Sequence, residues 1–121
     1  IRDMQIRKHP FGSTLVVGHW HNDMPGLTAD CRVLATSAGC PRQMIRYKHN
    51  VYGFQCHMEL TTEVVELLIA AEPDLEAQSN NYKFVQPPNA LLSYNYTEMN
   101  EKLYLFLDRL TKNFHQTVLQ K

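Results

Sequence analysis

The feature that most limits the possible folds of this chain is a short strand pattern followed almost at once by a helix pattern. Residues Val51 to Cys56 combine β-branched and aromatic side chains and follow the turn-forming segment 48–50. Residues Thr61 to Ala71 then show helical periodicity, with Thr61 or Thr62 as a cap and Glu63 near the positive end of the helix dipole. This order favours a fold in which helices pack on a sheet.

A histidine and a carboxylate lie at the end of that strand pattern. In an extended segment alternate residues share a face, so His57 and Glu59 project the same way with Cα atoms roughly 6.6 Å apart. A carboxylate bonded to one imidazole nitrogen fixes the tautomer, so the other nitrogen can take a proton from a nucleophile. The same alternation turns Cys56 to the opposite face, which excludes it as that nucleophile. A His-x-Glu pair also occurs at strand ends without any catalytic role.

A second group of polar side chains follows an earlier apolar run. Residues Thr14 to His19 predict a strand whose near-continuous apolar character suits burial on both faces. His19 and His21 after it have metal-ligand spacing, with Asp23 nearby, but no second cluster of histidine or cysteine supplies the remaining ligands of a zinc site. We therefore expect no metal and no cofactor. Trp20 is interpreted as a packing or pocket-wall residue.

Short strands and turns fill the middle of the chain. Residues 32–36, 43–47 and 51–56 predict three strands, separated by turn residues, as in an antiparallel meander. The polar and basic segment Ile1 to Ser13 contains Pro10 and Gly12, and it predicts a connection with one helical turn.

The last part of the chain is expected to be helical. Residues 61–71 carry one apolar face, and residues 74–96 predict short helical pieces within irregular chain. Thr97 is expected to cap a long final helix, whose apolar stripe should dock on a sheet or on another helix. The face of the first helix comprises Val64, Leu67, Leu68 and Ala71, and the stripe of the last comprises Met99, Leu103, Phe106, Leu107, Leu110 and Phe114.

Composition restricts the class of protein. The 121 residues are 44% hydrophobic and carry 12 basic and 12 acidic side chains, as in one small soluble domain over residues 1–121. The net charge is zero and no run of Lys and Arg occurs, so the sequence does not indicate binding to nucleic acid or to an anionic membrane. Three cysteines without paired spacing, Cys31, Cys40 and Cys56, favour reduced thiols and a cytoplasmic location.

Two segments resemble motifs of a known enzyme family. Gly53 to Glu59 resembles the G-x-Q-F-H-P-E signature of the class I glutamine amidotransferases, with Cys56 in place of the usual Phe and Met58 in place of the usual Pro. Residues 17–27 are similar to the H-x-D-x-x-x-L-P segment of the guanosine monophosphate synthetase-like branch, with His21 and Asp23 at the matching positions. The resemblance continues through residues 33–55.

This resemblance implies a fold, a reaction and a set of site residues. The fold would be α/β, the C-terminal half of a doubly wound, flavodoxin-like domain with a small antiparallel meander and two main helices. His57 and Glu59 would belong to a Cys-His-Glu triad that releases ammonia from glutamine, and the loop with His19, Trp20 and His21 would lie beside the substrate. Gln43 matches a glutamine of the family, for which a sheet hydrogen bond and a contact with ligand both remain open.

The nucleophile of the family is missing from the sequence. The family places it in a G-x-C-x-G elbow, and neither Cys31 nor Cys40 has the second glycine or a following helix pattern. Because the chain also begins with Ile1, we expect a fragment that is inactive alone and that associates with a complementary N-terminal half or with itself. A γ-glutamyl peptidase of the same superfamily and a non-catalytic interaction domain are the alternatives.

Overall fold

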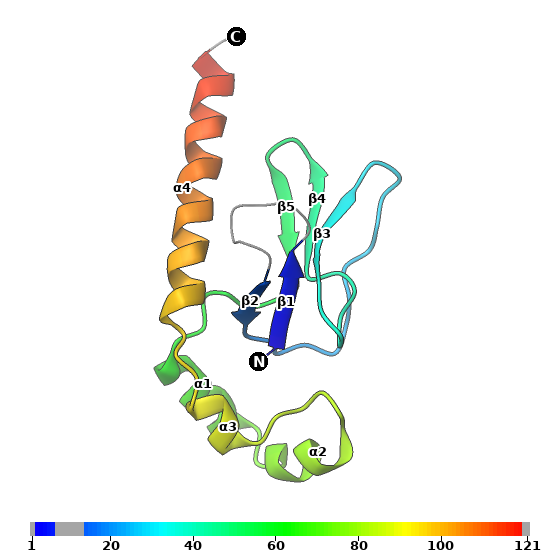
Figure 1. Cartoon of the computed structure of the whole chain (residues 1–121), viewed down its shortest axis with the longest axis vertical. Helices are drawn as coiled ribbons and strands as arrows, with labels where there is room; N and C mark the ends of the chain where they lie inside the picture. The colour runs from blue at the N-terminus through cyan, green and yellow to red at the C-terminus, as the bar shows by residue number, and fades with distance from the viewer. Residues whose placement is uncertain (1, 7–13, 120–121) are drawn as a thin grey trace.

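The computed structural model, which describes residues 2–6 and 14–119, contains a five-stranded sheet and four helices within those ranges (Figure 1). The strand order is β2-β1-β3-β4-β5, and every pairing among them is antiparallel. No parallel pair of a doubly wound sheet therefore lies in the described ranges. The strands are β1 (Arg2–Ile6), β2 (Thr14–Val17), β3 (Arg32–Thr36), β4 (Met44–Lys48) and β5 (Val51–Phe54).

The predicted meander is confirmed, with shifted boundaries. Strands β3, β4 and β5 are successive neighbours, and Asn50 makes the turn between the last two with a φ of 59°, a conformation that asparagine tolerates better than most residues. The last strand ends at Phe54, not at Cys56, because the chain bends there. After the bend, the His57 N–H bonds to the Gly18 carbonyl, 2.9 Å away. This isolated bridge connects the far end of β5 to the end of β2.

The prediction for the N-terminal segment was wrong where the structure describes it. Residues Arg2–Ile6 form strand β1, which pairs with β2 on one side and with β3 on the other. Residues 2–5 pair with β2, and Gln5 and Ile6 pair with β3, so backbone hydrogen bonds to distant segments outweigh the polar local composition. The rest of the predicted connection, at residues 1 and 7–13, lies outside the described residues.

Strand β2 is buried on one face only, which corrects the expectation of burial on both. Leu15 and Val17 belong to the hydrophobic core, whereas Val16 between them is 39% exposed. Successive side chains of a strand point to opposite faces, and among the described residues only one face of β2 is covered.

The helices are α1 (Thr62–Ala71), α2 (Leu75–Asn81), α3 (Pro88–Leu92) and α4 (Thr97–Leu119). Figure 1 shows α1, α2 and α3 grouped at one end of the molecule, while α4 stands beside the sheet. The two short helices are the pieces predicted within residues 74–96. None of the four, as far as the chain is described, has the length and apolar character needed to cross a membrane.

Helix α1 has the predicted cap but a different buried face. The Thr61 hydroxyl accepts the Val64 N–H, as expected of an N-cap. The core instead receives Val65, with Leu68 and Ile69 packed against it, while Leu67 is 71% exposed. The apolar run of α1 is wide enough to allow several faces, and docking against the core selects one of them.

Helix α4 contributes its N-terminal half to the core. Met99 and Phe106 are buried, and the Phe106 ring meets Tyr52 and Phe54 of β5 edge-to-face at centroid distances of 5.1 and 5.3 Å. Leu107 and Phe114 of the predicted stripe are exposed, although Leu103 and Leu110 pack against the core. The C-terminal turns of α4 extend beyond the strands (Figure 1). Thr97 is the first helical residue and not the cap.

Candidate functional site

The predicted histidine–carboxylate pair is formed. Nδ1 of His57 lies 2.6 Å from Oε1 of Glu59, with the two side chains 37% and 60% exposed. Because Glu59 occupies Nδ1, Nε2 is the ring nitrogen left to exchange a proton with another group. The bend after Phe54 means that this contact comes from an irregular segment and not from a regular strand.

Asn100 holds the backbone on both sides of Glu59. Its side-chain amide donates to the Met58 carbonyl at 2.7 Å and to the Leu60 carbonyl at 3.0 Å. The Met58 and Leu60 side chains are buried at the same time, so the exposed Glu59 is carried on a fixed backbone. Sequence reasoning missed Asn100. The signal in the sequence was that asparagine, a poor helix former, stands next to Met99 in the first turn of α4, where its side chain can bond to nearby backbone.

The two family-like segments meet in space. The Gln55 amide donates to Oδ1 of Asp23 at 3.2 Å. The backbone bridge between His57 and Gly18 joins the same two segments. His21 Nδ1 lies 2.9 Å from the Asp23 carbonyl, so the loop that follows β2 is also braced internally.

Two side chains of the meander bond to the turn at Pro25 and Gly26, which follows the loop after β2. Arg42 donates to the Pro25 carbonyl at 2.9 Å, and the Tyr47 hydroxyl donates to the Gly26 carbonyl at 2.7 Å. The chain from His19 to Gly26 is therefore fixed against the sheet although it forms no regular element.

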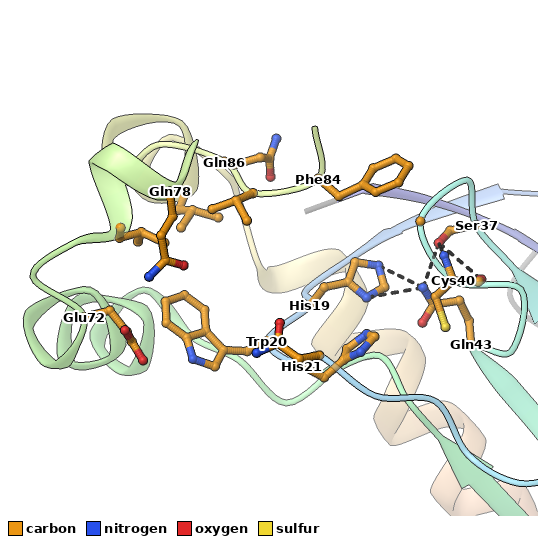
Figure 2. Close-up of a pocket in the computed structure, with 15 residues that line it drawn as sticks. His19, Trp20, His21, Ser37, Cys40, Gln43, Glu72, Gln78, Phe84 and Gln86 are labelled. Atoms are coloured by element: carbon orange, nitrogen blue, oxygen red, sulfur yellow. Dashed lines mark hydrogen bonds between the residues drawn. The ribbon is translucent and has the colours of Figure 1, made fainter. Parts of the chain in front are cut away.

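A cavity of about 250 Å³ opens beside this loop (Figure 2). All three residues predicted to bind substrate, His19, Trp20 and His21, line it, whereas His57 and Glu59 do not. The predicted catalytic pair is therefore not part of the cavity wall, although the backbone of His57 bonds to Gly18, next to His19.

Gln43 contacts both the sheet and the cavity. Its backbone N–H bonds to the Ala35 carbonyl and its carbonyl accepts the Gln55 N–H, both at 2.9 Å. Its side chain is fully buried, donates to the Ser37 hydroxyl at 2.7 Å and lies 3.3 Å from each ring nitrogen of His19. The sheet hydrogen bonds of Gln43 are therefore present, and its contact with a ligand stays a prediction.

The two buried cysteines are poor nucleophiles. Cys40 is 2% exposed in the turn before β4, and Cys56 is 4% exposed beneath the His57 segment. Burial raises the pKa of the Cys56 thiol to about 12, so it stays protonated. The three cysteines, all within the described residues, form no disulfide. The described residues contain no group of three or more His, Cys, Asp or Glu side chains arranged to hold a metal ion.

Known proteins share sequence and structure with this chain. The chain is 53% identical over 108 residues to the glutamine amidotransferase-like protein YfeJ of Salmonella typhimurium (strain LT2), a match that covers 86% of this chain and 45% of YfeJ. It is 43% identical to SMU.1228c, whose crystal structure superposes with a TM-score of 0.86 over 91% of this chain and 50% of that one. Most of the chain is therefore similar to about half of a glutamine amidotransferase-like protein.

The amidotransferase-like fold is shown independently by a more distant structure. A glutamine amidotransferase from Thermotoga maritima superposes with a TM-score of 0.71 at 21% identity, over 90% of this chain and 48% of that one. No family model matches the sequence. The chain spans about half the length of each of these proteins.

Proposed function

We propose that this chain is the C-terminal part of a glutamine amidotransferase-like hydrolase that releases ammonia from the side chain of glutamine. His57 acts as general base and then general acid, and Glu59 orients it. The observation that carries the proposal is the 2.6 Å contact between His57 Nδ1 and Glu59 Oε1, formed within the segment that resembles the family signature.

The proposed reaction needs a thiol from polypeptide outside these 121 residues. His57 Nε2 takes the thiol proton, and the sulfur attacks the side-chain carbonyl carbon of glutamine to give a tetrahedral intermediate. His57 returns the proton to the departing nitrogen, the C–N bond breaks, and ammonia leaves an acyl-enzyme. Water, deprotonated by His57, then hydrolyses the thioester to release glutamate and the thiol.

The loop after β2 is proposed to hold glutamine. The backbone around His19, Trp20 and His21 would line the substrate site, as the resemblance to the guanosine monophosphate synthetase-like branch implies. The bonds from Arg42 and Tyr47 support this role, because a loop braced against the sheet keeps its amide groups at fixed positions.

We expect the chain to be inactive alone, in the cytoplasm, and to associate with a complementary N-terminal segment or with itself. Val16 of β2 and Val51 of β5 are exposed on the two edge strands, at 39% and 48%, which supports such contact. Zero net charge gives no support to nucleic acid or membrane as partner.

The test is ammonia release from glutamine by the chain expressed with its upstream coding region. His57→Ala should abolish release, and His115→Ala, which removes an exposed histidine from α4, should not. An intact glutaminase that keeps its rate in His57→Ala would disprove the proposal.

A γ-glutamyl peptidase that uses the same triad is the second candidate. The exposure of His57 and Glu59, 37% and 60%, leaves space for a leaving group larger than ammonia. Competition between glutamine and a γ-glutamyl dipeptide in one rate assay decides between them, because the preferred substrate has the larger kcat/KM.

A further inference from the structure

The segment that carries the histidine–carboxylate pair has no strand partner along most of its length. Between His57 and the start of α1 the described chain shows no backbone–backbone hydrogen bond, since β5 has already ended. The side chains alternate there between inside and outside: Met58 and Leu60 are 1% and 6% exposed, whereas His57 and Glu59 reach solvent. The relative position of His57 and Glu59 must therefore be fixed by contacts other than a sheet ladder.

Asn100, in the first turn of α4, supplies two of these contacts. Its side-chain NH₂ group has two donor hydrogens and bonds to the Met58 carbonyl at 2.7 Å and to the Leu60 carbonyl at 3.0 Å. One carbonyl precedes Glu59 and the other follows it, so both ends of the short span around Glu59 are tied to a single amide. The preceding residue, Met99, is 3% exposed in the core, which fixes Asn100 itself.

Gly18, the residue after β2, holds the other end of the segment. Its carbonyl accepts the His57 N–H at 2.9 Å. A Cβ atom on Gly18 would lie 2.8 Å from the His57 carbonyl oxygen and 2.5 Å from Leu60 Cδ1, closer than non-bonded atoms pack. A backbone carbonyl cannot rotate away as a side chain can, so only glycine lets the two backbones come this close.

We propose that Asn100 and Gly18 are positioning residues for the His57–Glu59 pair. Gly18 fixes the backbone at His57, and Asn100 fixes it around Glu59. Together they keep the carboxylate at Nδ1, so that Nε2 stays available for proton transfer. Neither residue touches the substrate. The effect on ammonia release rests on the proposed function, whereas the geometry of the pair can be measured without any reaction.

Histidine ¹⁵N NMR of the 121-residue chain measures this geometry. A carboxylate can only accept, so Glu59 holds the proton of neutral His57 on Nδ1, and ¹⁵N shifts distinguish this tautomer from the Nε2–H form. At about pH 9, where an ordinary histidine is neutral, His57 should be mainly in the Nδ1–H form. Asn100→Ala should lower the ratio of Nδ1–H to Nε2–H roughly fivefold, as expected when one hydrogen bond is lost. An unchanged ratio in the folded variant would overturn the proposal.

Two further variants separate positioning from a general loss of stability. Asn100→Asp keeps the shape of the side chain but cannot donate when ionised, so it should lower the ratio as Asn100→Ala does. Gln116→Ala, on an exposed part of α4, should leave it unchanged. Spectra taken below the unfolding transition of each variant report folded molecules, in which a loss of stability alone does not alter the tautomer. A normal ratio in Asn100→Asp, or an equal loss in Gln116→Ala, would contradict the role of the Asn100 hydrogen bonds.

Gly18→Ala tests the other end of the segment. The added methyl group should push the His57 carbonyl away, break the bond from the His57 N–H, and speed exchange of that amide hydrogen with solvent roughly tenfold or more. Gly26→Ala is the matched control, because a Cβ atom there meets nothing within 4 Å. Equal exchange at His57 in the two variants would contradict the role of Gly18.

Kinetics in the chain expressed with its upstream coding region separates failure of this proposal from failure of the proposed function. Asn100→Ala should lower kcat for ammonia release roughly tenfold and change KM by less than about twofold, since Asn100 does not contact glutamine. If His57→Ala leaves the rate unchanged, the proposed function is wrong, and the tautomer ratios still decide the positioning. If His57→Ala abolishes release and Asn100→Ala leaves kcat intact, the positioning is wrong and the proposed function stands.

Discussion

The His57–Glu59 pair and the Gln43–Ser37 pair are both side-chain hydrogen bonds next to strand ends, yet their surroundings are opposite. The first is exposed and stands on a backbone that Asn100 holds in place. The second is enclosed, and Gln43 has no exposed surface. An exposed titratable pair can exchange protons, whereas an enclosed neutral pair can only select partners by hydrogen bonding. The same sheet thus carries one polar pair open to solvent and another closed off from it.

The sharpest way to break this comparison is to find chemical reactivity next to Gln43, where the buried Cys56 thiol donates to the Gln43 carbonyl at 3.7 Å. A pKa raised from 9.0 to about 12 lowers the thiolate fraction of Cys56 about a thousandfold at any pH well below both values. With iodoacetamide at mildly alkaline pH, Cys31, which is partly exposed, should be labelled in the native protein and Cys56 only after unfolding. Peptide mass spectrometry measures both sites, and rapid native labelling of Cys56 would contradict the burial described for it.

The exposed pair is expected to show the next largest effect. If the proposed function holds, His57→Ala in the chain expressed with its upstream coding region should lower the rate of ammonia release about 100-fold or more, the usual contribution of general acid–base catalysis. Glu59→Gln keeps the shape of the partner but removes its charge, and it should cost less than loss of the imidazole itself. Steady-state kinetics with both variants measures the order, and a larger loss in Glu59→Gln would reverse the assigned roles.

Asn100 tests whether the exposed pair depends on a fixed backbone. Asn100→Ala removes two hydrogen bonds and leaves the Met58 and Leu60 carbonyls without their donor, so the free energy of unfolding should fall by about 2 kcal/mol. Urea unfolding measures this. As a control, Gln116→Ala changes an exposed amide side chain later in α4 and should have a smaller effect.

Ser37→Ala tests the enclosed pair with a smaller change. It removes the acceptor for the Gln43 amide and for the Cys40 N–H, and the free energy of unfolding should fall by about 1 kcal/mol. Ser93→Ala, which removes an exposed hydroxyl bonded to the Ala90 carbonyl, is the matched control and should cost less. Equal effects would mean that enclosure adds nothing to this pair.

The sequence predicted local structure better than it predicted docking. The strands of the meander, the cap at Thr61 and the contact between His57 and Glu59 follow from turn residues, capping chemistry and short spacing, all of which act within a few residues. The strand at Arg2–Ile6 depends on two distant partners, and the buried face of α1 depends on the core it meets. Neither is determined by local sequence.

The site shows the same division. The family-like motifs identified His57, Glu59 and the loop at His19, Trp20 and His21, but not Asn100, which lies 40 residues beyond the Leu60 carbonyl that it binds. The cavity could not be predicted from the sequence either, because its wall combines the loop after β2 with residues 72–91 from the helical end of the chain. A contact across that separation has no signature in the spacing of residues.

The smallest predicted effect concerns the start of α1, the helix that follows the exposed pair. A hydrogen bond from the Thr61 side chain lowers the pKa of Glu63 below its ordinary value of 4.5. A carboxylate with a depressed pKa in the folded state stabilises that state above its unfolded pKa, and the contribution disappears as the pH falls through the folded pKa. Thermal unfolding of Glu63→Gln and of the unchanged protein should therefore differ slightly at neutral pH and converge below about pH 4. Glu66→Gln, which alters an exposed carboxylate one turn later on the same helix, is the control, and an equal convergence there would mean that the Thr61 bond is not its cause.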